Sequence, residues 1–124
     1  MAQTVCIIDD DQGVRESTGM LLSICGYEVE DYESIPQFLS VHPSDDGAII
    51  LLDQHMPQQT GLEFLESDEG RSFSARVVLM TGQGNSKLRE RALRDGVAGY
   101  VEKPVDIDRL MEIFTRLSLA PALR

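Results

Sequence analysis

Long hydrophobic runs, basic residues and cysteines are all scarce in this chain of 124 residues. No apolar stretch approaches the roughly 20 residues that a helix needs to cross a bilayer. The amino terminus, MAQTVCIIDDD, has no signal-peptide pattern, so we expect a cytoplasmic protein. The two cysteines, Cys6 in an apolar run and Cys25 on an apolar helix face, are expected to be reduced core residues rather than a disulfide or a metal pair.

The shortage of basic residues limits the partners of the chain. There are 21 acidic residues against 11 basic ones, which gives a net charge of -10 at pH 7. Nucleic acids and anionic membranes attract basic patches, so this charge argues against direct binding to either. Acidic chains favour cations and basic partners instead.

Strand-like and helix-like segments alternate along the whole chain, which is typical of βα units around a parallel sheet. The length and the hydrophobic content of 42% suit one domain with one core, which we assign to residues 1–119, with 120–124 as a tail or the start of a linker. The predicted strands are 5–9, an edge strand around 27–29, then 49–53, 76–81 and 100–103. A helix follows each strand, and the fourth covers 86–95.

Polar residues mark the starts of several of these helices. Ser34 with Gln37, and Thr60 with Glu63, have the spacing of capping boxes. Asp11, at the end of an acidic run, is best interpreted as a solvated acid or a helix N-cap.

Functional side chains end four of the five predicted strands. In chain order they are Asp9 with Asp10, Asp53, Thr81 and Lys103. The carboxyl ends of parallel strands share one edge of the sheet, where open α/β folds bind ligands. A charge at the end of an apolar run is rarely buried without a partner, so Asp53 is predicted to be functional. Taken alone, Thr81 fits an ordinary strand residue as well as a functional one. Lys103 likewise fits an ordinary surface lysine as well as a functional one.

The crowded carboxylates predict a divalent cation. Neighbouring carboxylates resist ionisation unless a positive charge offsets them. Mg²⁺ prefers oxygen ligands and keeps several waters, which leaves room for a phosphate oxygen, and Mn²⁺ is the alternative. The sequence shows no Cys/His cluster of the kind that binds zinc.

With a cation present, Asp53 can act as a nucleophile toward phosphorus and form an aspartyl phosphate. Lys103 can neutralise charge on the phosphoryl oxygens, and the Thr81 hydroxyl can donate a hydrogen bond to one of them. Phosphoryl transfer depends mostly on positioning and electrostatics, so little other covalent chemistry is required.

Four spaced motifs carry a family resemblance: IIDDD at 7–11, LLDQHMP at 51–57 with Gly61, LMTGQG at 79–84, and GYVEKP at 99–104. In this order they resemble a response-regulator receiver domain of two-component signalling. The chain is most similar to receivers of nitrogen-fixation-type regulators, which often precede a DNA-binding domain. The resemblance implies a single-domain, doubly wound (βα)₅ flavodoxin-like fold with five parallel strands in the order 2-1-3-4-5.

The resemblance also implies residue roles. The metal ligands are Asp9, Asp10, Asp53 and the main-chain carbonyl of His55, and Asp53 is the phosphoacceptor. The phosphate-contacting and switch residues are Thr81, Tyr100 and Lys103, and the Lys103–Pro104 peptide is cis. His55 and Gln83 flank the site and are expected to tune dephosphorylation. The pair Ala75-Arg76 stands where a proline often introduces the fourth strand in this family.

The function implied is a switch rather than an enzyme, because the domain assists only its own phosphorylation and dephosphorylation. A sensor histidine kinase or a histidine phosphotransfer protein donates the phosphoryl group to Asp53. The surface of the fourth helix, fifth strand and fifth helix then changes to control an effector or output domain, with transcription as one output. A homodimer through the fourth helix and fifth strand is expected.

Three other functions remain open. A receiver can be a constitutive docking or dimerisation module that phosphorylation does not control. An aspartate-nucleophile phosphohydrolase usually has a second acid two residues after the nucleophile, where this chain has His55. A flavodoxin-like cofactor carrier needs small residues after its first strand, whereas Asp9, Asp10 and Asp11 would repel phosphate.

Two further sets of residues are interpreted as surface features. The histidines His42 and His55 are expected to be exposed loop residues rather than phosphate acceptors. The basic residues of the fourth helix are expected to form its solvated face and to be a candidate docking surface; they are Lys87, Arg89, Arg91 and Arg94.

Overall fold

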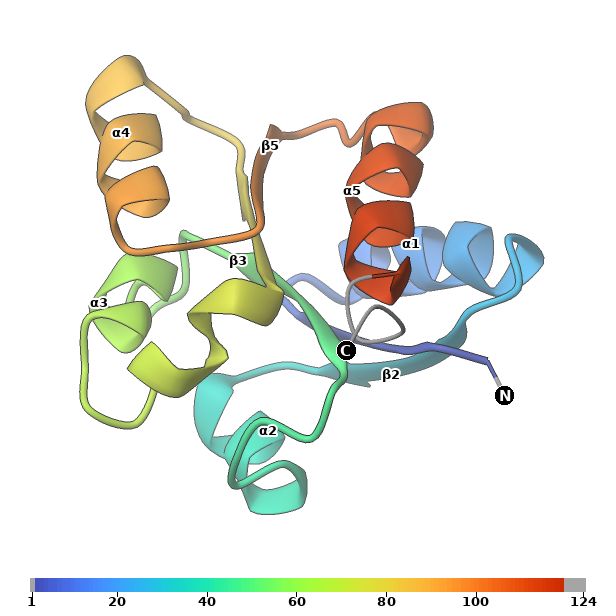
Figure 1. Cartoon of the computed structure of the whole chain (residues 1–124), viewed down its shortest axis with the longest axis horizontal. Coiled ribbons are helices and arrows are strands. Elements are labelled where there is room, and N and C mark those ends of the chain that lie inside the picture. The colour runs from blue at the N-terminus through green and yellow to red at the C-terminus, as the bar shows by residue number, and fades with distance from the viewer. Residues whose placement is uncertain (1, 120–124) are drawn as a thin grey trace.

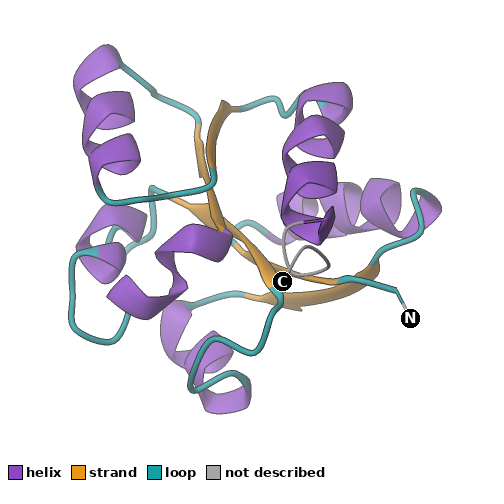
Figure 2. Cartoon of the chain, in the orientation of Figure 1, coloured by secondary structure: helices purple, strands orange, loops and turns teal. Residues whose placement is uncertain are grey.

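The computed structural model describes residues 2–119, which form one parallel sheet covered by helices on both faces (Figures 1 and 2). The strands are β1 (Thr4–Ile8), β2 (Glu28–Tyr32), β3 (Ile49–Asp53), β4 (Val77–Thr81) and β5 (Gly99–Glu102). The helices are α1 (Gln12–Ile24), α2 (Ile35–Val41), α3 (Gly61–Leu65), the 3₁₀ helix η1 (Arg71–Arg76), α4 (Ser86–Arg94) and α5 (Ile107–Leu119).

The strands lie in the order β2-β1-β3-β4-β5, and every neighbouring pair is parallel, which confirms the predicted fold class and strand order. The predicted tail at 120–124 lies outside the described residues, so the domain boundary stays a prediction. Within 2–119, no helix combines the length and apolar character that crossing a bilayer requires.

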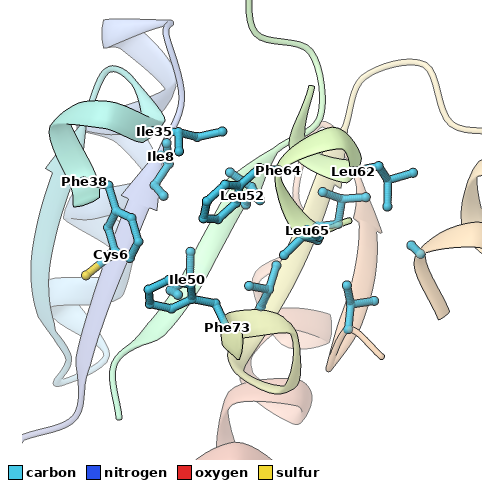
Figure 3. Packing of buried hydrophobic residues seen from close by; sticks show 14 of the residues in the cluster. Cys6, Ile8, Ile35, Phe38, Ile50, Leu52, Leu62, Phe64, Leu65 and Phe73 are labelled. Carbon is cyan, nitrogen blue, oxygen red and sulfur yellow. The ribbon is translucent and has the colours of Figure 1, made fainter. Parts of the chain in front are cut away.

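Two hydrophobic clusters, one on each face, hold the helices to the sheet. Alternate strand residues point to opposite faces, so Ile50 and Leu52 of β3 join one cluster while Ile49 and Leu51 join the other. The first cluster packs against α2, α3, η1 and α4, and Figure 3 shows its central part. The second packs against α1 and α5. Because both faces are covered, the three inner strands carry nearly continuous apolar runs.

The local predictions hold with small shifts at the element ends. Thr60 and Glu63 form the predicted capping box of α3, and Asp11 is the N-cap of α1. Ser34 caps α2 by accepting from the Gln37 N–H, but the Gln37 side chain accepts from the Glu33 N–H rather than from the Ser34 N–H, so the box is not completed. The strand β1 ends before Asp9, so this acid lies in the loop. The helix η1 was not predicted.

Two predictions of burial or exposure are wrong, since Cys25 was expected in the core and His42 on the surface. Cys25 is exposed because it caps α1 where the chain leaves the helix at Gly26, beyond the packed stripe around Leu22. His42 is buried, with 7% of its surface exposed, because its ring stacks on Phe38 at 5.2 Å at the end of α2. The assignment of His55 as an exposed residue is confirmed, as is that of the basic residues of α4.

Candidate functional site

Three carboxylates meet at the carboxyl edge of the sheet. The strands β1 and β3 are neighbours with Ile8 opposite Leu52, so the next residues, Asp9 and Asp53, come together. Asp9 and Asp53 are buried, whereas Asp10 is exposed. One oxygen of each of the three carboxylates lies within 4.8 Å of the others.

The loop after β1 is held in shape by the two ends of Asp9. Its Oδ1 accepts a hydrogen bond from the Asp11 N–H at 2.9 Å, which turns the chain into α1. Its main-chain carbonyl accepts from the Arg15 guanidinium at 2.8 Å, and Arg15 also pairs with Asp31 of β2. These hydrogen bonds with the start of α1 therefore stabilise the acidic loop against the repulsion between its carboxylates.

Lys103 brings the positive charge from the loop after β5. Its Nζ lies 2.8 Å from Oδ2 of Asp9 and 3.3 Å from Oδ1 of Asp53, and the following Lys103–Pro104 peptide is cis. Burial raises the pKa of Asp53 and the charge of Asp9 raises it further, while Lys103 opposes both. Burial would lower the pKa of Lys103, but its bond to Asp9 and the charge of Asp53 raise it.

The site suits a hard divalent cation. Three carboxylates face one ammonium group, and the buried Oδ1 of Asp53 has no well-formed hydrogen bond from any residue of the described chain. A cavity of about 440 Å³ opens beside them, lined among others by His55 and Gln83. The available donors are oxygens, which suit Mg²⁺ or Mn²⁺, and the cavity leaves space for waters or a phosphoryl group.

Thr81, at the end of β4, is buried and connected to the cavity through its neighbours. Its Oγ1 lies 2.8 Å from Nε2 of His55 and accepts a hydrogen bond from the Gln83 N–H at 3.1 Å. His55 and Gln83, predicted only to flank the site, thus contact the hydroxyl that was predicted to bind phosphate. This contact depends on the conformations of two loops, which residue spacing does not reveal.

Tyr100, the predicted switch aromatic on β5, is 9% exposed and packs in the cluster beneath α3 and α4. A Cβ added at Gly84 would lie 2.3 Å from its hydroxyl, so the ring closely underlies the loop after Thr81. This buried hydroxyl has no hydrogen-bond partner among the described residues. Tyr100 therefore lies next to the loop after Thr81, where the Asn85 N–H is close to its hydroxyl without forming a well-aligned hydrogen bond.

Two residues that the sequence analysis did not assign hold the loop after β3. Gln54 is buried, its side-chain Oε1 accepts from the Leu62 N–H at 2.9 Å, and its own N–H donates to the Met80 carbonyl at 2.8 Å. At Gly61 a Cβ would lie 2.8 Å from Leu79 and 3.0 Å from the carbonyl oxygen of Asp53. The Gly61 motif position was a usable signal, whereas nothing in the sequence marked Gln54.

This arrangement of acids, lysine and hydroxyl at the edge of a five-stranded sheet is the one expected of a receiver domain. The model of the response regulator receiver domain matches residues 5–115. The chain belongs to the response regulator receiver domain family.

Individual relatives agree with this membership. The transcriptional regulatory protein FixJ of Azorhizobium caulinodans is 38% identical over 102 residues, which cover 82% of this chain and 48% of that protein. The chemotaxis protein CheY of Treponema pallidum is 28% identical over 113 residues, covering 87% of this chain and 77% of that protein. The crystal structure of FixJ-N superposes with a TM-score of 0.79 at 26% identity, covering 97% of this chain and 96% of that one. The chain spans about half the length of the FixJ relatives that it matches.

Proposed function

We propose that this domain is a phosphorylation switch in which Asp53 accepts a phosphoryl group from a sensor histidine kinase or a histidine phosphotransfer protein. A carboxylate oxygen of Asp53 attacks phosphorus, and the bond from phosphorus to the donor's imidazole nitrogen breaks. The leaving imidazole takes up a proton from solvent. The observation that carries the proposal is the buried Asp53 carboxylate, placed between two acids and the ammonium group of Lys103.

Each of the surrounding residues has a separate role in the phosphoryl transfer. Asp9, Asp10, Asp53 and the His55 carbonyl would hold Mg²⁺ or Mn²⁺, which supplies positive charge to the phosphoryl oxygens when bound. Lys103 balances the charge of another phosphoryl oxygen, and the Thr81 hydroxyl turns from His55 to donate to a third. His55 and Gln83 border the cavity and so tune how water reaches the acyl phosphate.

The output is a changed surface on α4, β5 and α5. Movement of Thr81 reaches this surface through the loop under which Tyr100 lies, and α4 begins directly after that loop. A downstream effector or an output domain binds the changed surface, and the name of the FixJ relatives points to a transcriptional output. The same change favours a homodimer through α4 and β5. The exposed basic residues of α4 offer such a partner a positive patch on an otherwise acidic domain.

The direct test is intact-mass measurement after treatment with acetyl phosphate and Mg²⁺. We expect the gain of one phosphoryl group, lost with EDTA and in Asp53→Asn. Asp68→Asn, which removes an exposed acid on another part of the surface, is the matched control and should label normally. Failure of the wild-type chain to gain mass, or labelling that persists in Asp53→Asn, contradicts the proposal.

The constitutive docking function predicts a different response to beryllofluoride, which mimics the acyl phosphate. A switch gains thermal stability with Mg²⁺ and beryllofluoride because the ligand binds only the folded site. Light scattering under the same conditions should show a shift toward a dimer. An unchanged melting temperature and an unchanged mass in solution would favour the docking module.

A further inference from the structure

A second group of polar side chains lies away from the phosphoacceptor edge, between α2 and the sheet. Cys6 comes from the middle of β1, Glu30 from the middle of β2, His42 from the end of α2 and Asp46 from the loop before β3. Figure 3 shows Cys6 beside Phe38 at the margin of the first hydrophobic cluster, which lies under α2. These four residues, here called the α2 cluster, take no part in the proposed switch.

The α2 cluster is closely connected. The two ring nitrogens of His42 lie 2.7 Å from Oε1 of Glu30 and 2.6 Å from Oδ2 of Asp46. The Sγ of Cys6 is 3.5 Å from Nε2 of His42 and 4.0 Å from the same Glu30 oxygen. Cys6 and His42 are buried, whereas the Glu30 side chain is 42% exposed. A thiol, an imidazole and a carboxylate thus converge on one point from three elements.

We propose that Cys6, Glu30 and His42 form a binding site for a zinc-class divalent metal ion, with Asp46 as the residue that orients His42. Sulfur with imidazole and carboxylate is a donor set that suits Zn²⁺ and excludes Mg²⁺ and Ca²⁺, which require oxygen ligands. Asp46 occupies Nδ1 of His42, so Nε2 faces the thiol and is the nitrogen left for the metal. A carboxylate on the second nitrogen is the usual support of a metal-binding histidine.

The distances are close to those of a tetrahedral zinc site. Zinc–ligand bonds of about 2.0–2.3 Å place sulfur and nitrogen ligands about 3.6 Å apart and nitrogen and oxygen ligands about 3.4 Å apart. The observed 3.5 Å between Cys6 and His42 already fits. The Glu30 oxygen must move from His42 by about 0.7 Å. The same oxygen accepts a hydrogen bond from the Tyr32 hydroxyl at 2.5 Å, so this bond must adjust as the partly exposed Glu30 side chain moves, whereas the two buried ligands can stay in place.

Charge and access also suit a cation. The α2 cluster has two carboxylates and a thiol around one imidazole, and within residues 2–119 no lysine or arginine forms a hydrogen bond or ion pair with its side chains. Zn²⁺ displaces the thiol proton of Cys6 and the proton between His42 and Glu30, so an ion of charge two replaces two protons and the net charge is unchanged. A cavity of about 520 Å³ lined by Glu30, His42 and Asp46 gives a route from solvent and room for a water as the fourth ligand.

The test uses the whole chain, stripped of metal and kept reduced. Titration with Co²⁺, a spectroscopic substitute for zinc, should give the near-ultraviolet band of a cobalt–thiolate bond at one ion per chain, and Zn²⁺ should displace it. Cys6→Ser, which preserves size, should abolish the band and weaken zinc binding in calorimetry at least about tenfold. Asp46→Asn should keep the band but weaken binding by about 10–100-fold.

Two matched controls separate this site from others. Cys25→Ser removes the exposed thiol, and Asp10→Asn with Asp53→Asn disables the acidic edge; both proteins should retain the cobalt–thiolate band. Circular dichroism checks that Cys6→Ser is folded. Absence of the band in the wild-type chain, zinc binding of equal affinity in Cys6→Ser, or loss of the band in either control protein would overturn the proposal.

Discussion

Replacing Asp53 with asparagine should stabilise the metal-free protein, although Asp53 is the centre of the proposed function. Asp53→Asn keeps the shape of the side chain and removes its charge. The carboxylate is 2% exposed and its Oδ1 lacks an aligned hydrogen bond from the described residues, so the folded state holds a poorly compensated charge. Removing that charge relieves the repulsion from Asp9 and leaves Lys103 paired with Asp9 at 2.8 Å.

The size of the effect follows from three contributions. Repulsion between carboxylate oxygens that lie within 4.8 Å of one another is at least about 3.5 kcal/mol at an effective dielectric constant of about 20, and attraction to Lys103 at 3.3 Å is about 5 kcal/mol. Desolvation of the buried carboxylate costs several kcal/mol and turns the balance against the charge. We expect Asp53→Asn to raise the free energy of unfolding by about 1–2 kcal/mol, or the Tm by about 4–8 °C.

Urea and thermal unfolding at pH 7 with EDTA measure this difference, with Asp68→Asn as a control that should change stability by less than about 0.5 kcal/mol. Mg²⁺ should then stabilise the wild type by about 1.4 kcal/mol at ten times its Kd and leave Asp53→Asn nearly unchanged. The reasoning is refuted if the substitution lowers stability in EDTA, or if Mg²⁺ stabilises both proteins equally.

The same substitution has a pH signature. The pKa of Asp53 is raised above its ordinary value of 3.8, so the folded state holds this proton more tightly than the unfolded state. The stability contributed by the neutral acid is complete below that value and is lost as the pH rises through the raised pKa. The gain in free energy of unfolding of Asp53→Asn over the wild type should therefore shrink as the pH is lowered from the raised pKa to the ordinary value. A gain that grows over this pH range would contradict the raised pKa of Asp53.

Three further substitutions test the surroundings of the site. Gly61→Ala should lower the free energy of unfolding by about 1–3 kcal/mol in urea titrations, because its Cβ would lie 2.8 Å from Leu79; wild-type stability would show that the loop yields freely. Tyr100→Phe removes a buried hydroxyl without a partner in the described chain, so stability should stay equal or rise by up to about 1 kcal/mol, and a loss above about 2 kcal/mol would reveal a missed hydrogen bond. Arg91→Ala breaks a partly exposed pair with Glu66 between α4 and α3 and should cost less than about 1 kcal/mol in thermal unfolding; a larger loss would mean that the pair holds the helices together.

The fold was predictable from the sequence because each inner strand is an apolar run bounded by a turn, and each helix has its own start signal. The strand β3 was predicted at its observed bounds, since Ile49–Leu52 carry no polar residue and the loop begins after Asp53. The helix η1 was missed because a short 3₁₀ turn has no apolar period. Its last residue, Arg76, is buried and donates to the carbonyl oxygens of Gly47 and Leu117, contacts that appear only once the sheet is assembled.

The candidate site was predictable to the extent that it lies on strand ends. Asp9, Asp53 and Lys103 converge because parallel strands finish at one edge. The contact between His55 and Thr81 could not be predicted, because it depends on how the loop after β3 folds over the last residue of β4. The same limit explains the α2 cluster: Cys6 and His42 are 36 residues apart, with none of the short spacings of known zinc motifs, and only the pairing of β1 with β2 and the packing of α2 bring them together.

The contacts of Thr81 and Tyr100 explain how one phosphoryl group could change the surface of the domain. For Thr81 to reach a phosphoryl oxygen, its hydroxyl must leave His55, and a hydrogen bond of this kind is worth about 0.5–1.5 kcal/mol. Tyr100 has no hydrogen bond among the described residues to lose, so its reorientation costs mainly packing beneath Gly84. A shift from 1% to 99% active requires about 5.5 kcal/mol of differential binding. A hydrogen bond from Thr81 to the phosphoryl group and the ion pair of that group with Lys103 supply part of this difference, and neither contact requires a large rearrangement of the sheet.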